Sequence, residues 1–245
     1  MRRMVPSLTW VSSLGIGKMN KGDVRRNVLK IRDAISVADK AQYDASIRET
    51  ITSMTEYRDA EVILAYASYR SEVDTLMLIK QALNDGKYVF APKVVGNEME
   101  FWKITTIKDL QEGYRGILEP VQNVSFPDWV RERCSFVNVD KVTDKDKAEN
   151  CASEVCKVMM WMPGVVFDGE RHRIGYGGGF YDRYLNRLLQ QSEQTAFADQ
   201  ARTQSGRFIL TTVALAYSCQ ILEQIPYDEH DVKPNMLVTE QEICS

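Results

Sequence analysis

Apolar residues fall along this chain alternately at helical spacing and in short continuous runs. The first helical pattern covers residues 21–35, where four apolar positions share one face: Val24, Val28, Ile31 and Ile35. Ser36 and Asp39 then match a capping box, which predicts a second helix that ends at about Met54. Two further helices are predicted, over residues 73–87 and from Phe180 onward.

The continuous apolar runs predict strands. The runs at residues 60–68 and 155–167 are typical of strands that are covered on both faces. Four more strands are predicted, over residues 88–95, 99–104, 208–218 and 233–240. Because strands alternate with helices, we expect an α/β fold with a mostly parallel sheet.

Polar segments interrupt this pattern in three places. Residues 113–120 are expected to form a loop, because glycines and a closing proline punctuate them. Residues 123–154 are rich in charged side chains and are expected to form a surface insertion with little order of its own. Residues 190–207 are expected to form another polar connection. No internal repeat or linker divides the chain, so we expect a single domain.

Composition and charge exclude several classes of protein. The net charge is −3, so no overall basic field favours a nucleic acid partner. No stretch approaches the roughly 18 apolar residues of a membrane helix, and Pro6 interrupts a mildly apolar start that would otherwise resemble a signal peptide. The five cysteines lack CxxC and zinc-ligand spacing, so we expect reduced thiols and a cytoplasmic location. His172 and His230 fit no metal-ligand pattern and are expected at the surface.

A glycine-rich turn between a strand and a helix carries the clearest chemical signal. Its four glycines are Gly175, Gly177, Gly178 and Gly179. The free N–H groups and the positive dipole end of the following helix favour an anion at such a turn. Phe180 takes the place of the last glycine of GxGxxG and no GK[ST] follows, so neither familiar nucleotide motif is present. A phosphate site and a tight structural turn both remain open.

Charged residues near this turn are candidates for binding a phosphate or a metal ion. Arg171 and Arg173 precede the glycines and could neutralise a phosphate. Asp182, in the first turn of the following helix, either complements the helix dipole or holds Mg²⁺ against phosphate oxygens. Asp231 is either a second metal carboxylate or a turn former.

Two other segments offer charges with both a structural and a functional interpretation. Lys21 and Arg25 are i, i+4 neighbours on the first helix, with Arg32 on the same side, and they form either a solvated basic face or an anion site. Glu72 and Asp74 precede a helix after a strand, where they either cap the helix or bind a ligand.

Taken together, these segments resemble the 5-formyltetrahydrofolate cyclo-ligase family. The string MPGVVFDGERHRIGYGGGFYDRYL is similar to the glycine-rich signature of that family. Three more segments agree in order: KGDVRRNVLKIRDAIS, SYRSEVDT and EHDVKPNMLVT. The resemblance covers most of residues 21–240 and fails around residues 123–154, around residues 191–207 and over residues 1–18.

The resemblance implies an enzyme that closes a folate ring with ATP and Mg²⁺. ATP phosphorylates the formyl oxygen of 5-formyltetrahydrofolate, a neighbouring nitrogen attacks, and 5,10-methenyltetrahydrofolate, ADP and phosphate are released. The implied fold is a three-layer α/β/α sandwich similar to the phosphosugar-isomerase and CoA-transferase-like superfamily. We expect a monomer whose partner is the folate, with one domain over residues 19–245.

Site residues follow from the resemblance position by position. Lys21 and Arg25 would contact the ATP phosphates, and Asp182 and Asp231 would hold Mg²⁺. The remaining nucleotide contacts would be Arg173, Gly175, Tyr176, Gly177, Gly178, Gly179, Phe180 and Tyr181. The folate contacts would be Glu72, Met99, Phe180 and Tyr181. Lys21, Arg173 and Asp182 would be the catalytic residues.

The chain departs from the family pattern at several positions. Arg171 stands where the signature usually has glycine, Tyr176 and Gly178 where some relatives are basic, and Asn235 where aspartate is common. These changes are expected to reshape the turn and weaken phosphate contacts. Residues 1–18 have no counterpart, and we expect them to be disordered or untranslated, with Met19 as the start.

Two other functions remain open on the same scaffold. One is a ligand-binding protein without turnover, and the other is an enzyme related to sugar-phosphate isomerases. The retained charges at Lys21, Arg25, Asp182 and Asp231 favour catalysis over the first alternative.

Overall fold

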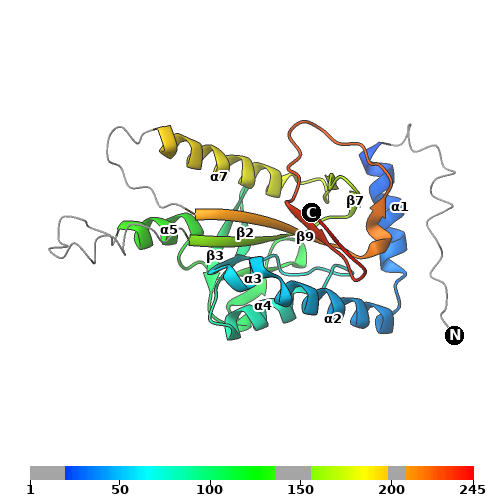
Figure 1. Ribbon diagram of the computed structural model, residues 1–245, viewed down its shortest axis with the longest axis horizontal. Helices are drawn as coiled ribbons and strands as arrows, with labels where there is room; N and C mark the ends of the chain where they lie inside the picture. Colours follow the sequence, from blue (N-terminus) through cyan, green and yellow to red (C-terminus); the bar gives the residue numbers. More distant parts are fainter. Residues whose placement is uncertain (1–19, 136–155, 198–207) are drawn as a thin grey trace.

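A seven-stranded sheet forms the centre of the molecule (Figure 1). The computed structural model describes residues 20–135, 156–197 and 208–245. The strand order is β12-β11-β9-β6-β1-β2-β3, and the five inner strands are parallel. These are β1 (Val62–Leu64), β2 (Tyr88–Val95), β6 (Cys156–Met162), β9 (Phe208–Leu215) and β11 (Met236–Val238). The antiparallel edges are β3 (Glu98–Ile104) and β12 (Ile243–Cys244), so the predicted mostly parallel α/β sheet is confirmed.

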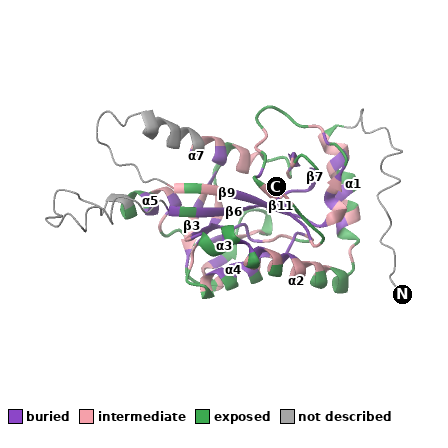
Figure 2. Cartoon of the chain, in the orientation of Figure 1, coloured by how far each residue is buried: buried purple, intermediate pink, exposed green. Residues whose placement is uncertain are grey.

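Helices cover both faces of this sheet. One face carries α2 (Val37–Ser53), α3 (Thr55–Asp59) and α4 (Thr75–Asn84). The other carries α5 (Phe126–Ser135) and α7 (Phe180–Phe197). Side chains of β1 alternate accordingly: Ile63 packs in the first core and Val62 and Leu64 in the second. Figure 2 shows buried residues along much of β6 and β9, which lie between the helices.

A smaller sheet lies beside the main one and supports the first helix. Its strands are β10 (Ile221–Leu222), β7 (Val166–Asp168) and β8 (Arg173–Ile174). Helix α1 (Lys21–Asp33) packs on it through Val24 and Val28, which form a third core with Val165. The predicted single strand over residues 155–167 is therefore wrong, because the chain leaves β6 at Pro163 and enters a different sheet.

Two segments predicted to be loops contain regular structure. In the segment predicted to have little order, α5 buries Phe126 completely, 5.5 Å from the Phe90 ring and 5.6 Å from the Phe208 ring. The predicted loop at residues 113–120 contributes β5 (Leu118–Pro120), which pairs with β4 (Leu110–Glu112). Three short 3-10 helices complete the described chain: η3 (Ile107–Asp109), η4 (Tyr114–Gly116) and η6 (Ser218–Gln220).

One predicted boundary differs from the structure, and two predicted segments lie wholly or partly outside the described residues. Helix α7 continues through the first residues of the predicted polar connection at 190–207. The predictions for residues 1–18 and for the rest of the 123–154 insertion, beyond α5, lie outside the described residues. Within the described ranges, no helix has the length and apolar character needed to cross a membrane.

Candidate active site

The candidate site lies at the point of the sheet where the order of its strands reverses. From β1 the chain adds β2 on one side, and later it adds β6 on the other side. The carboxyl ends of two such strands form the crevice in which open α/β sheets bind ligands. Two arginines meet the segment that follows β6: Arg173 donates to the Pro163 carbonyl (3.2 Å) and Arg32 to the Gly164 carbonyl (3.5 Å).

The glycine loop between β8 and α7 requires its glycines. Gly177 and Gly179 have φ values of 98° and 62°, in the left-handed region that other residues rarely adopt. A β-carbon at Gly178 would lie 2.8 Å from the Phe180 ring. Helix α7 starts at Phe180, so its free N–H groups face the end of this loop. The tight turn is therefore real, and it is compatible with an anion at the helix N-terminus.

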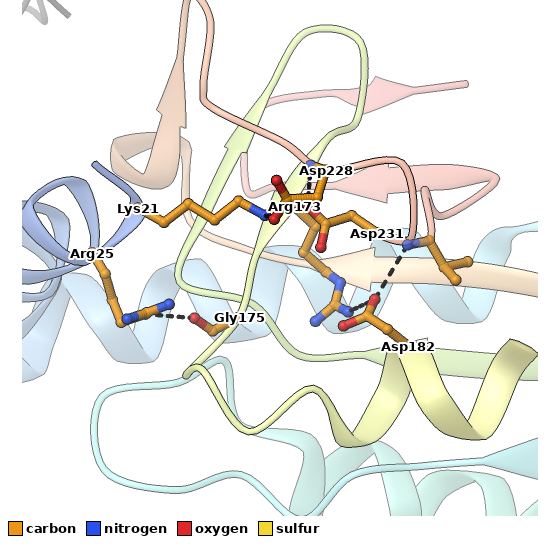
Figure 3. A network of polar contacts seen from close by, with 8 residues as sticks. Lys21, Arg25, Arg173, Gly175, Asp182, Asp228 and Asp231 are labelled. Atoms are coloured by element: carbon orange, nitrogen blue, oxygen red, sulfur yellow. Dashed lines mark hydrogen bonds and ion pairs between the residues drawn. The ribbon is translucent and has the colours of Figure 1, made fainter. Parts of the chain in front are cut away.

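Two basic residues of α1 point toward the site, Arg25 to the glycine loop and Lys21 to the segment between β10 and β11 (Figure 3). The Lys21 ammonium pairs with Asp228 (2.6 Å) and Asp231 (2.5 Å), and Arg25 donates to the Gly175 carbonyl (2.7 Å). Partial burial alone would lower the pKa of Lys21, but its two carboxylate partners raise that pKa above its usual value. A purely solvated basic face is therefore wrong for these residues.

Arg173 and Asp182 form a second ion pair beside the first (Figure 3). The Arg173 Nη2 lies 2.6 Å from the Asp182 Oδ1. Asp182 also accepts from the Val232 N–H (3.2 Å), through the same oxygen that Arg173 contacts. Arg173 is 6% exposed, and its Nε is buried without a hydrogen-bond partner. Buried donors in native proteins nearly always have a partner, so this Nε calls for a specific explanation.

The carboxylates of Asp182 and Asp231 each keep one oxygen for another ligand. Within the described chain, hydrogen bonds engage only Oδ1 of Asp182 and only Oδ2 of Asp231. Burial tends to raise the pKa of Asp231, but the Lys21 and Asp228 hydrogen bonds lower it overall, so this carboxylate is ionised. No group of three or more metal-ligating side chains exists in the described ranges.

Glu72 lies in a buried polar network beneath the glycine loop. Arg32 donates to the Tyr176 hydroxyl (2.7 Å), which also hydrogen-bonds with Glu72, and Glu72 accepts from the Tyr69 N–H (2.7 Å). Burial raises the pKa of Glu72, although these hydrogen bonds oppose the rise. Asp74, in contrast, caps α4 by accepting from the Leu76 N–H (2.9 Å). Asp74 therefore has the capping role that the sequence left open.

The predicted aromatic and apolar contacts lie at different depths. Phe180 is half-buried and meets Tyr114 edge to face, with ring centroids 6.3 Å apart. Tyr181 is half-buried and packs against both main cores. Met99 is buried in the second core. Phe180 and Tyr181 are therefore more accessible than Met99, and a folate contact by Met99 stays a prediction.

His172 is not at the surface as predicted. It is 4% exposed, its ring stacks on Tyr227 with centroids 3.7 Å apart, and its Nδ1 lies 2.9 Å from Asp168. Asp168 also accepts from the Ile225 N–H (3.3 Å), so this buried pair anchors the segment that leads to Asp231. The stacking joins residues 55 positions apart, and no local pattern could have indicated it.

Sequence reasoning also missed the environment of two charged residues. Arg32 is 2% exposed and donates to Ser71 (3.0 Å), so it belongs to the network of Glu72 and not to the basic face of α1. Asp228 shares Lys21 with Asp231, and its spacing three residues before Asp231 was the only available signal.

The fold and the site define an α/β protein in which a glycine-rich loop, the start of α7 and a set of ion pairs lie together beside the sheet. A model of the 5-formyltetrahydrofolate cyclo-ligase family matches residues 17–240. The chain belongs to this family.

Individual relatives agree with this assignment. The 5-formyltetrahydrofolate cyclo-ligase of Mus musculus is 26% identical over 214 residues, which cover 86% of this chain and 89% of the relative. The mitochondrial 5-formyltetrahydrofolate cyclo-ligase of Arabidopsis thaliana is 29% identical over 227 residues, which cover 88% of this chain and 72% of the relative. The solved structure of the Aquifex aeolicus 5,10-methenyltetrahydrofolate synthetase superposes with a TM-score of 0.66 at 26% identity, covering 92% of each chain.

Proposed function

We propose that this chain is an enzyme that converts 5-formyltetrahydrofolate to 5,10-methenyltetrahydrofolate, with ATP consumed and ADP and phosphate released. The observation that carries the proposal is the set of cations around the glycine loop of a cyclo-ligase family member: Lys21, Arg25 and Arg173.

The chemistry of the reaction explains why such a set is needed. Ring closure must expel the formyl oxygen, which is a poor leaving group until it carries a phosphoryl group. Transfer of the γ-phosphoryl to this oxygen breaks the bond to ADP, attack by the neighbouring nitrogen forms the new C–N bond, and phosphate leaves with the oxygen. Positioning and charge stabilisation dominate phosphoryl transfer, and no covalent nucleophile of the protein is required.

The nucleotide phosphates would take the place of internal ion-pair partners. Lys21 now pairs with Asp231, and a bound phosphate would compete for the same ammonium. Arg173 would donate to the phosphates through the Nε that has no protein partner. The backbone of Gly175, Gly177, Gly178 and Gly179 and the start of α7 would form the cradle.

Mg²⁺ fits the two carboxylates that keep one oxygen each, Asp182 and Asp231. Two protein carboxylates completed by phosphate oxygens and water are a usual magnesium site. When bound, the ion would neutralise charge on the transferring phosphoryl group.

The folate would bind on the other side of the glycine loop. Glu72 offers a buried carboxylate, and Phe180 and Tyr181 offer aromatic faces for a planar ring. Tyr176 was expected to contact the nucleotide, but we propose its side chain for the folate side instead, because its hydroxyl contacts Glu72 and Arg32. We expect a monomeric, cytoplasmic, single-domain enzyme. The alternatives are a binding protein without turnover and a sugar-phosphate isomerase-like enzyme of the related superfamily.

A spectrophotometric assay tests the proposal. Purified protein with Mg²⁺, ATP and 5-formyltetrahydrofolate is expected to produce the absorbance of the methenyl product. Asp182→Asn is expected to lower kcat at least about 100-fold, with circular dichroism as the check that the fold survives the loss of the partner of Arg173. Absence of product with ATP and with other nucleotides would refute the proposal.

A further inference from the structure

Buried side-chain nitrogen and oxygen atoms without a hydrogen-bond partner are few in the described chain, and they fall into two groups. Two lie at the candidate site, on Tyr66 and Arg173. Three others belong to Glu100, Trp102 and Tyr184, on the outer side of β3 and α7. Buried hydroxyls in native proteins nearly always have a partner, so each exception calls for a specific explanation.

Tyr66 occupies a position where a substrate is expected. It lies two residues beyond the end of β1, at the switch point of the sheet, and is 3% exposed. Its carbonyl accepts from the Thr75 hydroxyl (2.5 Å), which holds the backbone in place. Its side chain is therefore presented by a rigid element at the carboxyl edge of the sheet.

The surroundings of the Tyr66 hydroxyl are polar and belong to the folate side of the site. Burial, and then the carboxylate of Glu72 and the hydroxyls of Tyr176 and Tyr181, hold the pKa of Tyr66 well above its usual value. The hydroxyl therefore stays neutral and can both donate and accept a hydrogen bond.

The polar neighbours of Tyr66 are already engaged with one another. The Tyr176 hydroxyl joins Arg32 to Glu72, and Glu72 also accepts from the Tyr69 N–H. Phenylalanine at position 66 would fill the same space without an unpaired hydroxyl. A tyrosine here is advantageous when a bound molecule supplies the missing partner.

We propose that the Tyr66 hydroxyl hydrogen-bonds the polar edge of the folate pteridine and is a substrate-binding residue beside Glu72 and Tyr176. This inference rests on the proposed function, because it takes the folate as the occupant of the site. The N–H and carbonyl groups of a reduced pteridine match a neutral hydroxyl next to a carboxylate.

Substitution by phenylalanine tests the proposal, with a matched control. Tyr66→Phe is expected to raise the Kd and KM for 5-formyltetrahydrofolate about 3- to 10-fold. The KM for ATP is expected to stay at the wild-type value, and the melting temperature at or above the wild-type value, since no protein hydrogen bond is lost. Tyr184→Phe removes an equally unpaired hydroxyl away from the site and should leave both constants for the folate unchanged.

Calorimetric binding and steady-state turnover separate the possible outcomes. A Tyr66→Phe enzyme with the wild-type folate Kd would overturn the proposal, as would an equal loss in Tyr184→Phe. If the wild-type protein bound the folate without turning it over, the proposed function would fail, and the Kd comparison would still decide the role of Tyr66. If the wild-type protein did not bind the folate, both would be refuted.

Discussion

Arg171 adopts a backbone conformation that favours glycine. Its φ is 67°, in the left-handed region, and its side chain donates to the Pro234 carbonyl (3.2 Å). The family pattern has glycine here, and the turn keeps the conformation that glycine would adopt easily. Arginine at this position therefore strains the turn, and the expected reshaping of the turn stays a prediction.

Two substitutions at this position separate the energetic cost of the left-handed backbone from the loss of the hydrogen bond. Arg171→Gly and Arg171→Ala both remove the hydrogen bond to Pro234, but only glycine relieves the left-handed strain. We expect the glycine variant to be more stable than the alanine variant by about 0.5–1 kcal/mol, since the strain of roughly 1–2 kcal/mol exceeds the extra entropy of unfolded glycine. Urea unfolding of both variants measures this difference. An alanine variant of equal or higher stability would show that position 171 is not strained.

Lys21 is held at the site by two carboxylates, so its substitution should act on the nucleotide. Lys21→Ala is expected to raise the KM for ATP about 10- to 100-fold, the range for loss of a charge-assisted hydrogen bond. The KM for the folate should change little. Lys30→Ala, on the same helix but exposed, is the control and should behave as wild type. A defect confined to the folate KM would contradict the assignment.

At the scale of elements, the Lys21–Asp231 pair joins α1 to the segment that follows β10. The folded-state pKa of Asp231 is lowered, so its ionised form adds stability above its unfolded pKa of about 4, and this contribution is lost as the pH falls through the folded value. The stability difference between wild type and Asp231→Asn is therefore expected to be constant from about pH 5 to pH 7 and to shrink below about pH 4. Urea unfolding at several pH values measures it. A difference that grew on acidification would contradict the pairing.

Helix α5 is part of the core, although its segment is polar overall. Phe126 lies between the rings of Phe90 and Phe208, so Phe126→Ala is expected to destabilise the fold by about 3–5 kcal/mol. Val37→Ala, at an 88% exposed position, should stay within about 0.5 kcal/mol of wild type. Denaturant unfolding measures the loss of stability in both variants. A loss below about 1 kcal/mol for Phe126→Ala would mean that α5 is a dispensable insertion.

Sequence periodicity predicted most of the elements but not their membership in a sheet. The helices at α1, α2, α4 and α7 and the strands at β1, β2, β3, β6 and β9 all appeared in the pattern. The break at Pro163 was missed because β6 and β7 are both buried, and a run of apolar residues reports burial without naming the sheet. Helix α5 was missed because charged neighbours diluted its short apolar face.

At the scale of the whole molecule, the site combines segments that lie far apart in the chain. Glycine spacing and charge indicated the chemistry of residues 171–182, and the family resemblance indicated Lys21, Glu72 and Asp231. The partners of each residue followed only from the folded chain: Lys21 meets Asp231 across 210 positions, and Arg32 meets Tyr176 across 144. Pairings of this kind depend on how the two sheets pack, which no local pattern contains.

In the proposed reaction, this site transfers a phosphoryl group from ATP to the formyl oxygen of the folate. A single-turnover reaction with 5-formyltetrahydrofolate labelled with ¹⁸O at the formyl group tests it most directly, with mass spectrometry of the released phosphate. The label is expected to leave in the phosphate as the methenyl product forms. Unlabelled phosphate, with the ¹⁸O found in water, would contradict it.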